Sequence, residues 1–272
     1  MFQDIPNEFD INFDGREIDE KAYVLCYDGE KVLCRIDGGA EFPRIGNLKD
    51  RPETVFAFSA DGIRYFLCLS GRASAEGFEY KSLKAVRGAA QDINKFAAIT
   101  GFHYYKFHGE NRFCGRCGGK LVHDPEKRCM LCGNCGNEVF PKISPAVIVG
   151  IIDQENDSIV LTKYAERDYK KYALVAGFAE MGESAEDAVK REVMEETGLE
   201  ITELKYYKSQ PWGLAQNLLI GFLGYVKGSR RIIMDKNELS EAVWVSREKL
   251  QVGNEGVSLT EDMMRAFKEG RI

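Results

Sequence analysis

The sequence predicts an α+β protein of three parts: a strand-rich N-terminal domain, a short cysteine-rich segment and a C-terminal α/β sandwich. Three observations predict this. The first hundred residues hold strand-like runs joined by Asp-Gly pairs, five cysteines then crowd into residues 114–135, and the remainder mixes apolar runs with two helical patterns. A chain of 272 residues is long enough for roughly two domains with cores of their own. We set the boundaries at 1–108, 109–141 and 142–272.

The N-terminal domain is predicted from its turns. Asp28-Gly29 and Asp61-Gly62 each separate two apolar, strand-like runs, which is a strong signal for a hairpin. Apolar residues at helical spacing over residues 83–99 predict a helix that closes the domain. The aromatic run 101–108 is interpreted as a packed inter-domain segment, with a binding surface as the alternative.

The C-terminal sandwich is predicted from apolar runs after Pro141. Strands are expected at 146–153, 158–164, 172–178, 218–226 and 242–246, and helices at 184–197 and 259–270. Strands mixed with two helices over about 130 residues favour helices packed on a sheet.

Charge and hydropathy exclude some classes. The net charge is −6 and the pI about 5.4, so tight nucleic-acid binding by a broadly basic surface is not expected. No run approaches the ~18 apolar residues that a membrane span requires. The acidic first residues lack an apolar signal region, so a cytoplasmic location is expected.

Four cysteines predict a structural zinc site. The pairs Cys114/Cys117 and Cys132/Cys135 follow the pattern C-x2-C-x14-C-x2-C, which is close to that of a four-cysteine zinc site. Four thiolates leave no open position for water, so one structural Zn²⁺ per chain is expected. Redox or disulfide chemistry is the alternative. Cys129 is the spare cysteine.

The same segment carries other polar residues. His108 and His123 are interpreted as bystanders of the zinc site. Five cations make the segment locally basic, which keeps nucleic-acid binding open beside simple surface charge: Arg112, Arg116, Lys120, Lys127 and Arg128.

A glutamate-rich helix is the strongest functional signal. Residues 177–199 follow the pattern G-x5-E-x7-R-E-U-x-E-E-x-G-U, where U is aliphatic. Ser184 is placed to cap the helix, and Glu192 and Glu196 project from one side of it, flanked by Glu195. Two carboxylates ~6 Å apart cost about 2–3 kcal/mol at an effective dielectric of 20, a cost that a bound cation removes. Hard oxygen ligands favour Mg²⁺ or Mn²⁺.

These acids predict a phosphoryl-transfer site. Metals held by Glu192 and Glu196, with Glu195 assisting, would bridge phosphate oxygens and acidify a water. Arg191 is expected to fix Glu183 rather than to touch the substrate. Gly177 and Gly198 are expected to allow tight turns at either end of the motif.

The pattern matches the Nudix box at every position, so the chain resembles the Nudix hydrolase superfamily. From about residue 82 it resembles the NADH pyrophosphatase (NAD diphosphatase) family: a zinc ribbon precedes the box, residues 140–147 read FPKISPAV, and SQPW follows at 209–212. The family signature is SQPWPFPxS, whereas this chain continues with Gly213-Leu-Ala-Gln-Asn217. Without the two prolines we expect a looser loop and an altered nucleotide pocket.

The resemblance implies a Nudix α/β/α sandwich with a mixed sheet, and hydrolysis of NAD(H) to AMP and nicotinamide mononucleotide with Mg²⁺ or Mn²⁺. It also implies Glu238 as a metal ligand outside the box, with Glu241 as the fallback, and the Ala176 carbonyl as a further ligand. The substrate-binding residues that it implies are Phe140, Phe178, Gln210, Pro211, Trp212, Gly213, Leu214, Ala215, Gln216 and Asn217.

The resemblance further implies a homodimer, and it permits removal of an NAD cap from RNA. Two alternatives stay open. One is a broader pyrophosphatase that acts on ADP-ribose, FAD or a related dinucleotide. The other is a non-catalytic zinc-ribbon protein whose Nudix fold senses a nucleotide; the three intact acids argue against it.

Overall fold

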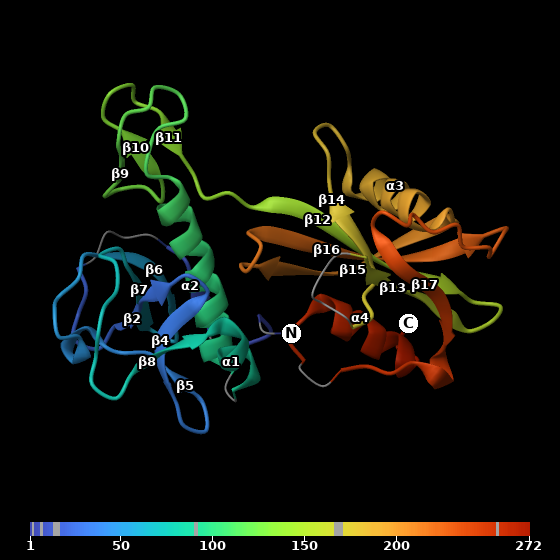
Figure 1. Ribbon diagram of the computed structural model, residues 1–272, viewed down its shortest axis with the longest axis horizontal. Helices are drawn as coiled ribbons and strands as arrows, with labels where there is room; N and C mark the ends of the chain where they lie inside the picture. The colour runs from blue at the N-terminus through green and yellow to red at the C-terminus, as the bar shows by residue number, and fades with distance from the viewer. Residues whose placement is uncertain (2, 6–7, 13–16, 90–91, 166–170, 254–255) are drawn as a thin grey trace. The chain divides into compact units, whose positions relative to one another are not determined.

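The computed structural model describes residues 1, 3–5, 8–12, 17–89, 92–165, 171–253 and 256–272 (Figure 1). Its contacts divide the chain into two compact units. The N-terminal unit comprises residues 2–143 and 212–216, and the C-terminal unit comprises Met1, 144–211 and 217–272. Each unit is described by itself.

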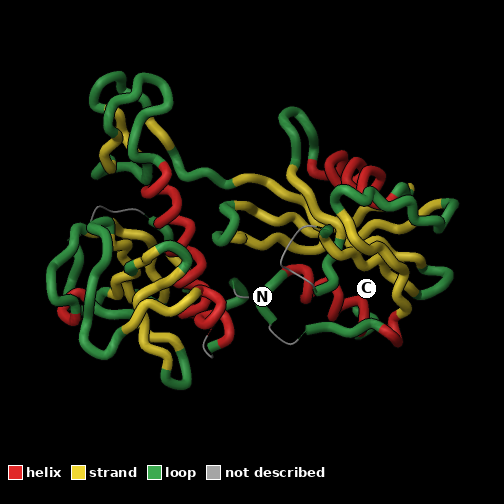
Figure 2. Tube along the Cα trace, in the orientation of Figure 1, coloured by secondary structure: helices red, strands yellow, loops and turns green. Residues whose placement is uncertain are grey.

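Two small sheets form the first part of the N-terminal unit (Figure 2). The first has the order β1 (Phe9–Asp10), β6 (Thr54–Ala60), β7 (Ile63–Cys68), β2 (Tyr23–Leu25). The second has the order β3 (Tyr27–Asp28), β4 (Lys31–Ile36), β5 (Ala40–Glu41), with β8 (Glu79–Ser82) also pairing β4. A 3-10 turn, η1, spans Ile45–Asn47.

Both predicted hairpins are confirmed. The strand pairs β3–β4 and β6–β7 are antiparallel. At the second turn, Asp61 and Gly62 both have positive φ, 49° and 71°. This is the backbone of a two-residue turn whose twist matches that of its strands, and Asp-Gly adopts it at low cost.

The predicted helix over 83–99 is two helices. α1 (Leu83–Gly88) ends because Ala89 is extended, with φ −76° and ψ 154°. The second, α2 (Asp92–Glu110), continues well past residue 99; residues 90–91 lie outside the described part. The aromatic run 101–108 is therefore helical. It packs closely, because a Cβ at Gly101 would overlap side chains of Leu25 and Tyr27.

A three-stranded sheet follows α2 and completes the N-terminal unit apart from 212–216. Its order is β11 (Glu138–Val139), β10 (Met130–Cys132), β9 (Leu121–His123), all antiparallel. Phe107 from α2 packs with Leu121 and Met130 against the cysteines. This core is small, as the short segment predicts.

The C-terminal unit is built on a six-stranded mixed sheet. Its order is β15 (Glu200–Trp212), β16 (Asn217–Lys227), β12 (Ser144–Asp153), β13 (Ser158–Tyr164), β17 (Leu239–Ser246), with β14 (Val175–Phe178) pairing β12. β12 and β16 are parallel, while β12–β13, β12–β14 and β13–β17 are antiparallel.

One helix covers each face of this sheet (Figure 1). Side chains alternate along β12: Val147 and Val149 pack toward α3 (Ala185–Thr197), whereas Ile148 and Ile152 pack toward α4 (Leu259–Lys268). A second 3-10 turn, η2 (Arg247–Lys249), precedes α4. The predicted α/β/α sandwich with a mixed sheet is confirmed.

The segment 200–212 is a strand that the sequence does not predict. SQPW, expected in a loop, lies at its end, and only Trp212 at the tip groups with the N-terminal unit. Among the described residues, no helix combines the length and the apolar character needed to cross a membrane.

Candidate active site and zinc centre

The four predicted zinc ligands meet in space. The Sγ atoms of Cys114, Cys117, Cys132 and Cys135 all lie within 4.8 Å of one another. The first pair follows α2, and the second begins at the last residue of β10. Four soft sulfur donors converging at this range fit a tetrahedral zinc.

The two Cys-x2-Cys turns have the same backbone. Gly118 and Gly136 have φ of 73° and 69°, and their N–H groups donate to the carbonyls of Cys114 and Cys132 at 2.8 and 2.9 Å. The N–H of Arg116 points at the Cys114 sulfur, 3.4 Å away. Backbone N–H groups hold the pKa of Cys114 at about 6, which favours the thiolate that zinc requires.

Cys129 lies outside this group, as predicted. It is buried, and burial raises the pKa of its thiol. The nearby Asp124 accepts the N–H groups of Glu126 and Lys127, so that carboxylate closes a turn.

The ends of α3 are fixed by its sequence. Ser184 caps the N-terminus, because its hydroxyl accepts the N–H of Asp187 at 3.2 Å and donates to the Asp187 carboxylate at 2.7 Å. Gly198 ends the helix in the left-handed conformation, with φ of 66°. The helix therefore presents one fixed face to the sheet.

That face carries two buried carboxylates. Glu192 and Glu196 are only 9% and 2% exposed, and they follow the buried Ala188, Val189 and Val193 around the same helix. Burial raises the pKa of Glu192; the Arg191 guanidinium lowers it, and the charges of Glu195 and Glu238 raise it again. Four acidic or basic groups thus share one small region.

Gly177 matters through packing rather than through a turn. It lies within β14 with no positive φ, and a Cβ there would overlap the carboxyl group of Glu192. A glycine inside a strand often marks such a close approach. The expectation of a tight turn is wrong at Gly177 and confirmed at Gly198.

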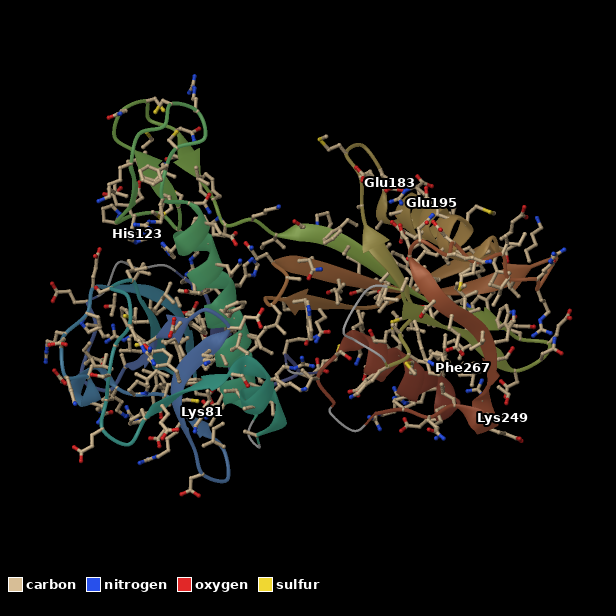
Figure 3. All side chains as sticks on the ribbon, viewed as in Figure 1. Lys81, His123, Glu183, Glu195, Lys249 and Phe267 are labelled. Carbon is tan, nitrogen blue, oxygen red and sulfur yellow. The ribbon has the colours of Figure 1, made fainter. Side chains whose placement is uncertain are left out.

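Arg191 joins the acids. Its Nε and Nη2 donate to the two carboxylate oxygens of Glu183 at 2.8 and 2.9 Å, the pairing that the sequence predicts. Nη1 donates to Glu192 at 2.6 Å and to Glu195 at 3.0 Å. Nη2 also donates to the carbonyl of Phe178 at 2.9 Å, which ties the loop before α3 to β14. Figure 3 shows Glu183 and Glu195 together beside α3.

Glu238 is a better candidate than Glu241 for the metal ligand outside the motif. The charge of Glu238 raises the pKa of Glu192, and backbone hydrogen bonds Asp235 N to Glu196 O and Ile233 N to Thr197 O hold the preceding segment at the end of α3. The Glu241 carboxylate is occupied by two other side chains. It accepts hydrogen bonds from the Lys163 ammonium and the Tyr172 hydroxyl, each at 2.6 Å, and this triad cannot be recognised from the sequence alone.

Gln210 does not line a surface. It is fully buried, its amide donates to Val257 O at 2.8 Å, and its carbonyl accepts Leu259 N at 2.7 Å. It therefore fixes the start of α4, and its predicted contact with the substrate remains a prediction. Asn217 is also buried, next to Ser144 in the sheet, and its Oδ1 has no hydrogen-bond partner within the described ranges.

The aromatic candidates differ in accessibility. Phe178 and Phe140 are 52% and 57% exposed, so both rings are available. Phe178 lies directly after Gly177, beside the acids. Trp212 is partly covered, because Arg87 of α1 lies 5.4 Å from the centre of its ring. Pro211 is exposed at the end of β15, and Ala176 lies opposite Ile148 in the sheet.

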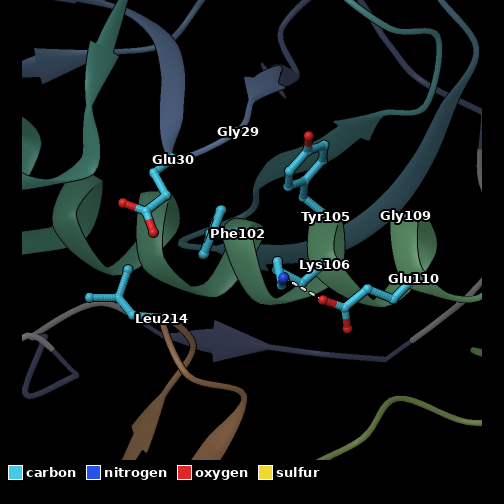
Figure 4. Close-up of a pocket in the computed structure, with 8 residues that line it drawn as sticks. All are labelled: Gly29, Glu30, Phe102, Tyr105, Lys106, Gly109, Glu110 and Leu214. Atoms are coloured by element: carbon cyan, nitrogen blue, oxygen red, sulfur yellow. Dashed lines mark ion pairs between the residues drawn. The ribbon is translucent and has the colours of Figure 1, made fainter.

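The altered segment 213–216 is held in the N-terminal unit rather than loose. A Cβ at Gly213 would overlap the carbonyl of Ile99, and Ala215 N donates to Trp212 O at 3.1 Å. Gln216, with φ of 55°, donates to Glu110 at 2.9 Å. Leu214 lines a cavity of about 360 Å³ beside α2, which includes none of the α3 glutamates (Figure 4).

Comparison with known proteins defines the class. Residues 142–267 match the model of the NUDIX domain, the region that holds α3 and its acids. Residues 110–140 match the NADH pyrophosphatase zinc ribbon domain, so the two matches together cover more than half of the 272 residues. The chain therefore contains a Nudix domain preceded by an NADH pyrophosphatase zinc ribbon, and the resemblance inferred from the sequence is confirmed.

Curated relatives agree over the same region. The "NAD-capped RNA hydrolase NudC" of Citrobacter koseri is 37% identical over 161 residues, 59% of this chain and 62% of that protein. The protein of the same name from Klebsiella pneumoniae is 37% identical over 154 residues, 56% and 58% of the two chains. "Nudix hydrolase 19, chloroplastic" of Arabidopsis thaliana is 37% identical over 153 residues, 54% and 35%. The chain thus spans less than two thirds of the length of these relatives.

Solved structures also resemble part of the chain. A NUDIX hydrolase from Nitrosomonas europaea covers 59% of this chain and 92% of its own, with a TM-score of 0.46 and 20% identity.

Proposed function

We propose that this protein is a metal-dependent pyrophosphohydrolase that cleaves NAD(H), with water, into AMP and nicotinamide mononucleotide. One observation carries the proposal above the others. Glu192 and Glu196 are both buried on the sheet-facing side of α3, and Arg191 binds Glu192 as well as Glu183 and Glu195. Burying two like charges on one helix face is costly unless a cation joins them, and a pyrophosphate needs such a cation.

The donor set fits Mg²⁺ or Mn²⁺. Glu192 and Glu196 would hold the metal, with the Glu238 carboxylate and the Ala176 carbonyl as further hard oxygen ligands. When bound, the cation supplies charge neutralisation for the pyrophosphate and a more acidic water. Arg191 keeps Glu183 and the Phe178 carbonyl in place, and Gly177 leaves room for the Glu192 carboxylate.

The substrate preference follows from the rings near the acids. Phe178 is exposed and its carbonyl is bound by Arg191, so a base stacked on it would place its phosphates next to Glu192. We propose Phe140, Pro211 and Trp212 as further substrate contacts, together with Gly213, Leu214, Ala215, Gln216 and Asn217. The relatives named as NAD-capped RNA hydrolases support NAD(H) as the small substrate and NAD-capped RNA as the large one.

A broader pyrophosphatase is the second candidate. The segment 213–216 lacks the two family prolines and is held by α2 instead, so its contribution to the pocket differs from that of the family signature. Such a pocket would accept ADP-ribose or FAD as well. A nucleotide sensor remains the third candidate. The domain boundaries 1–108, 109–141 and 142–272, the homodimer and the cytoplasmic location remain predictions.

Product analysis distinguishes these candidates. Purified protein with Mg²⁺ or Mn²⁺ is incubated separately with NADH, NAD⁺, ADP-ribose and FAD, and the products are separated by chromatography. We expect AMP and reduced nicotinamide mononucleotide from NADH, faster than cleavage of the other compounds. Faster cleavage of ADP-ribose or FAD would favour the broader enzyme. No cleavage of any compound would overturn the proposed activity in favour of the sensor.

A further inference from the structure

The zinc ribbon exposes an aromatic ring that contributes nothing to its core. Phe113 is 67% exposed, although a segment as small as the ribbon has few apolar side chains to bury in its core. Phe113 and Lys120 are directly paired across an antiparallel bridge. Because residues paired in this way project from the same face, the Phe113 ring and the Lys120 side chain start from neighbouring positions on one face of the ribbon.

Among the described residues, three cations that form no ion pair lie close to Phe113 in the sequence. Within the described ranges, the side chains of Arg112, Arg116 and Lys120 form no ion pair or hydrogen bond, and all three residues lie within eight positions of Phe113. Other cations of the ribbon are used by the fold: Lys127 binds Glu138 at 2.5 Å, and Arg128 binds the Tyr104 hydroxyl. The unpaired charges of the ribbon are therefore concentrated in residues 112–120, the segment that contains Phe113.

An exposed ring beside unpaired cations suits single-stranded nucleic acid. The ring stacks on a base of any identity while the cations contact the phosphates on either side of it. The whole chain carries a net charge of −6, so attraction of a polyanion requires a local group of cations such as this one. A two-fold contact between two copies of this surface would bury Phe113 but would bring three more cations against these three.

We propose that Phe113, Lys120, Arg112 and Arg116 form a binding surface for a short single-stranded RNA segment. The inference rests on the proposed function for its role: the segment would be the RNA body of a capped substrate. The binding step itself does not need the Nudix acids. It can therefore be measured with RNA that carries no cap.

Fluorescence anisotropy tests the surface. The zinc-loaded full chain is titrated into a 5′-labelled, uncapped ten-nucleotide oligo(A) RNA at several salt concentrations. We expect Phe113→Leu to weaken binding at least about fivefold and Phe113→Tyr to preserve it, because stacking needs a ring. We expect Arg116→Gln to lower the slope of log affinity against log salt by about 0.7, the loss of one phosphate contact.

Lys127→Gln is the matched control, since it removes the same charge from the same ribbon but from a cation that Glu138 already binds. It should leave the slope unchanged. Absence of RNA binding by the unaltered protein would overturn the inference, as would equal affinity for Phe113→Leu. The inference would also be overturned if RNA affinity were unchanged while Arg116→Gln lost zinc, because Arg116 would then serve the zinc site. The same holds if RNA affinity were unchanged while Phe113→Leu altered the oligomeric state, because Phe113 would then serve a contact between subunits. NADH hydrolysis, assayed in parallel, shows separately whether the proposed function fails.

Discussion

The carboxylate of Glu192 occupies the space that a side chain at residue 177 would need. Gly177→Ala would push this carboxylate away from Glu196, and a displacement of about 1 Å costs roughly a hundredfold in turnover. We expect that loss in kcat for NADH, with the fold retained in circular dichroism. Gly150→Ala is the control, because its new Cβ would meet Leu223 at 3.4 Å, an ordinary contact. Equal losses in the two variants would contradict the packing argument.

His108 should make the stability of the protein sensitive to acid. Burial, with the charge of His123, lowers its pKa from 6.5 to about 4. Between these values the unfolded chain binds the proton and the folded chain does not, so folding becomes less favourable as pH falls from 6.5 toward 4. At pH 5 this amounts to about 2 kcal/mol relative to pH 7.5.

Urea unfolding of the protein and of His108→Asn at both pH values measures the effect. Between pH 7.5 and pH 5, the free energy of unfolding should fall by about 2 kcal/mol more for the unaltered protein than for His108→Asn. Parallel falls in the two proteins would show that His108 does not titrate as its burial implies.

At the scale of elements, Gln210 links the end of β15 to the start of α4. Gln210→Leu would leave Val257 O and Leu259 N buried without their partner, at about 1–3 kcal/mol for each group. We expect a lower melting temperature but an unchanged KM for NADH. A raised KM with unchanged stability would support Gln210 as a substrate contact.

Motifs whose residues lie close together in the sequence could be predicted, whereas contacts between residues distant in the sequence could not. The cysteine pairs and the α3 acids are spaced by turns and helical geometry, so their meeting needs no knowledge of the rest of the chain. Gln210 acts through residues almost fifty positions later, and Glu241 through Lys163 and Tyr172 on other strands. The strand over 200–212 alternates little between buried and exposed residues, which removes the signal that marks a strand.

The zinc ribbon offers a second test at this scale. Cys132→Ser should lose the metal, because it removes one of four converging sulfurs, whereas Cys129→Ser should keep about one zinc per chain. Elemental analysis after dialysis provides the measurement. Equal zinc in the two variants would refute the assigned ligand set.

At the scale of the whole molecule, the two units carry different chemistry. The N-terminal unit holds the four sulfurs and the segment 212–216, and the C-terminal unit holds the buried acids of α3. A substitution among the acids should therefore leave the zinc site intact. This separation makes zinc content an internal control for the central claim, which is hydrolysis of a pyrophosphate at Glu192 and Glu196.

The most direct test is the rate of NADH hydrolysis by Glu196→Gln with saturating Mg²⁺ or Mn²⁺. The substitution keeps the size of the side chain and removes the charge that a metal needs. We predict a fall in kcat of roughly a thousandfold, with zinc content and circular dichroism unchanged. An unchanged kcat in a folded, zinc-loaded variant would contradict the assignment of this site.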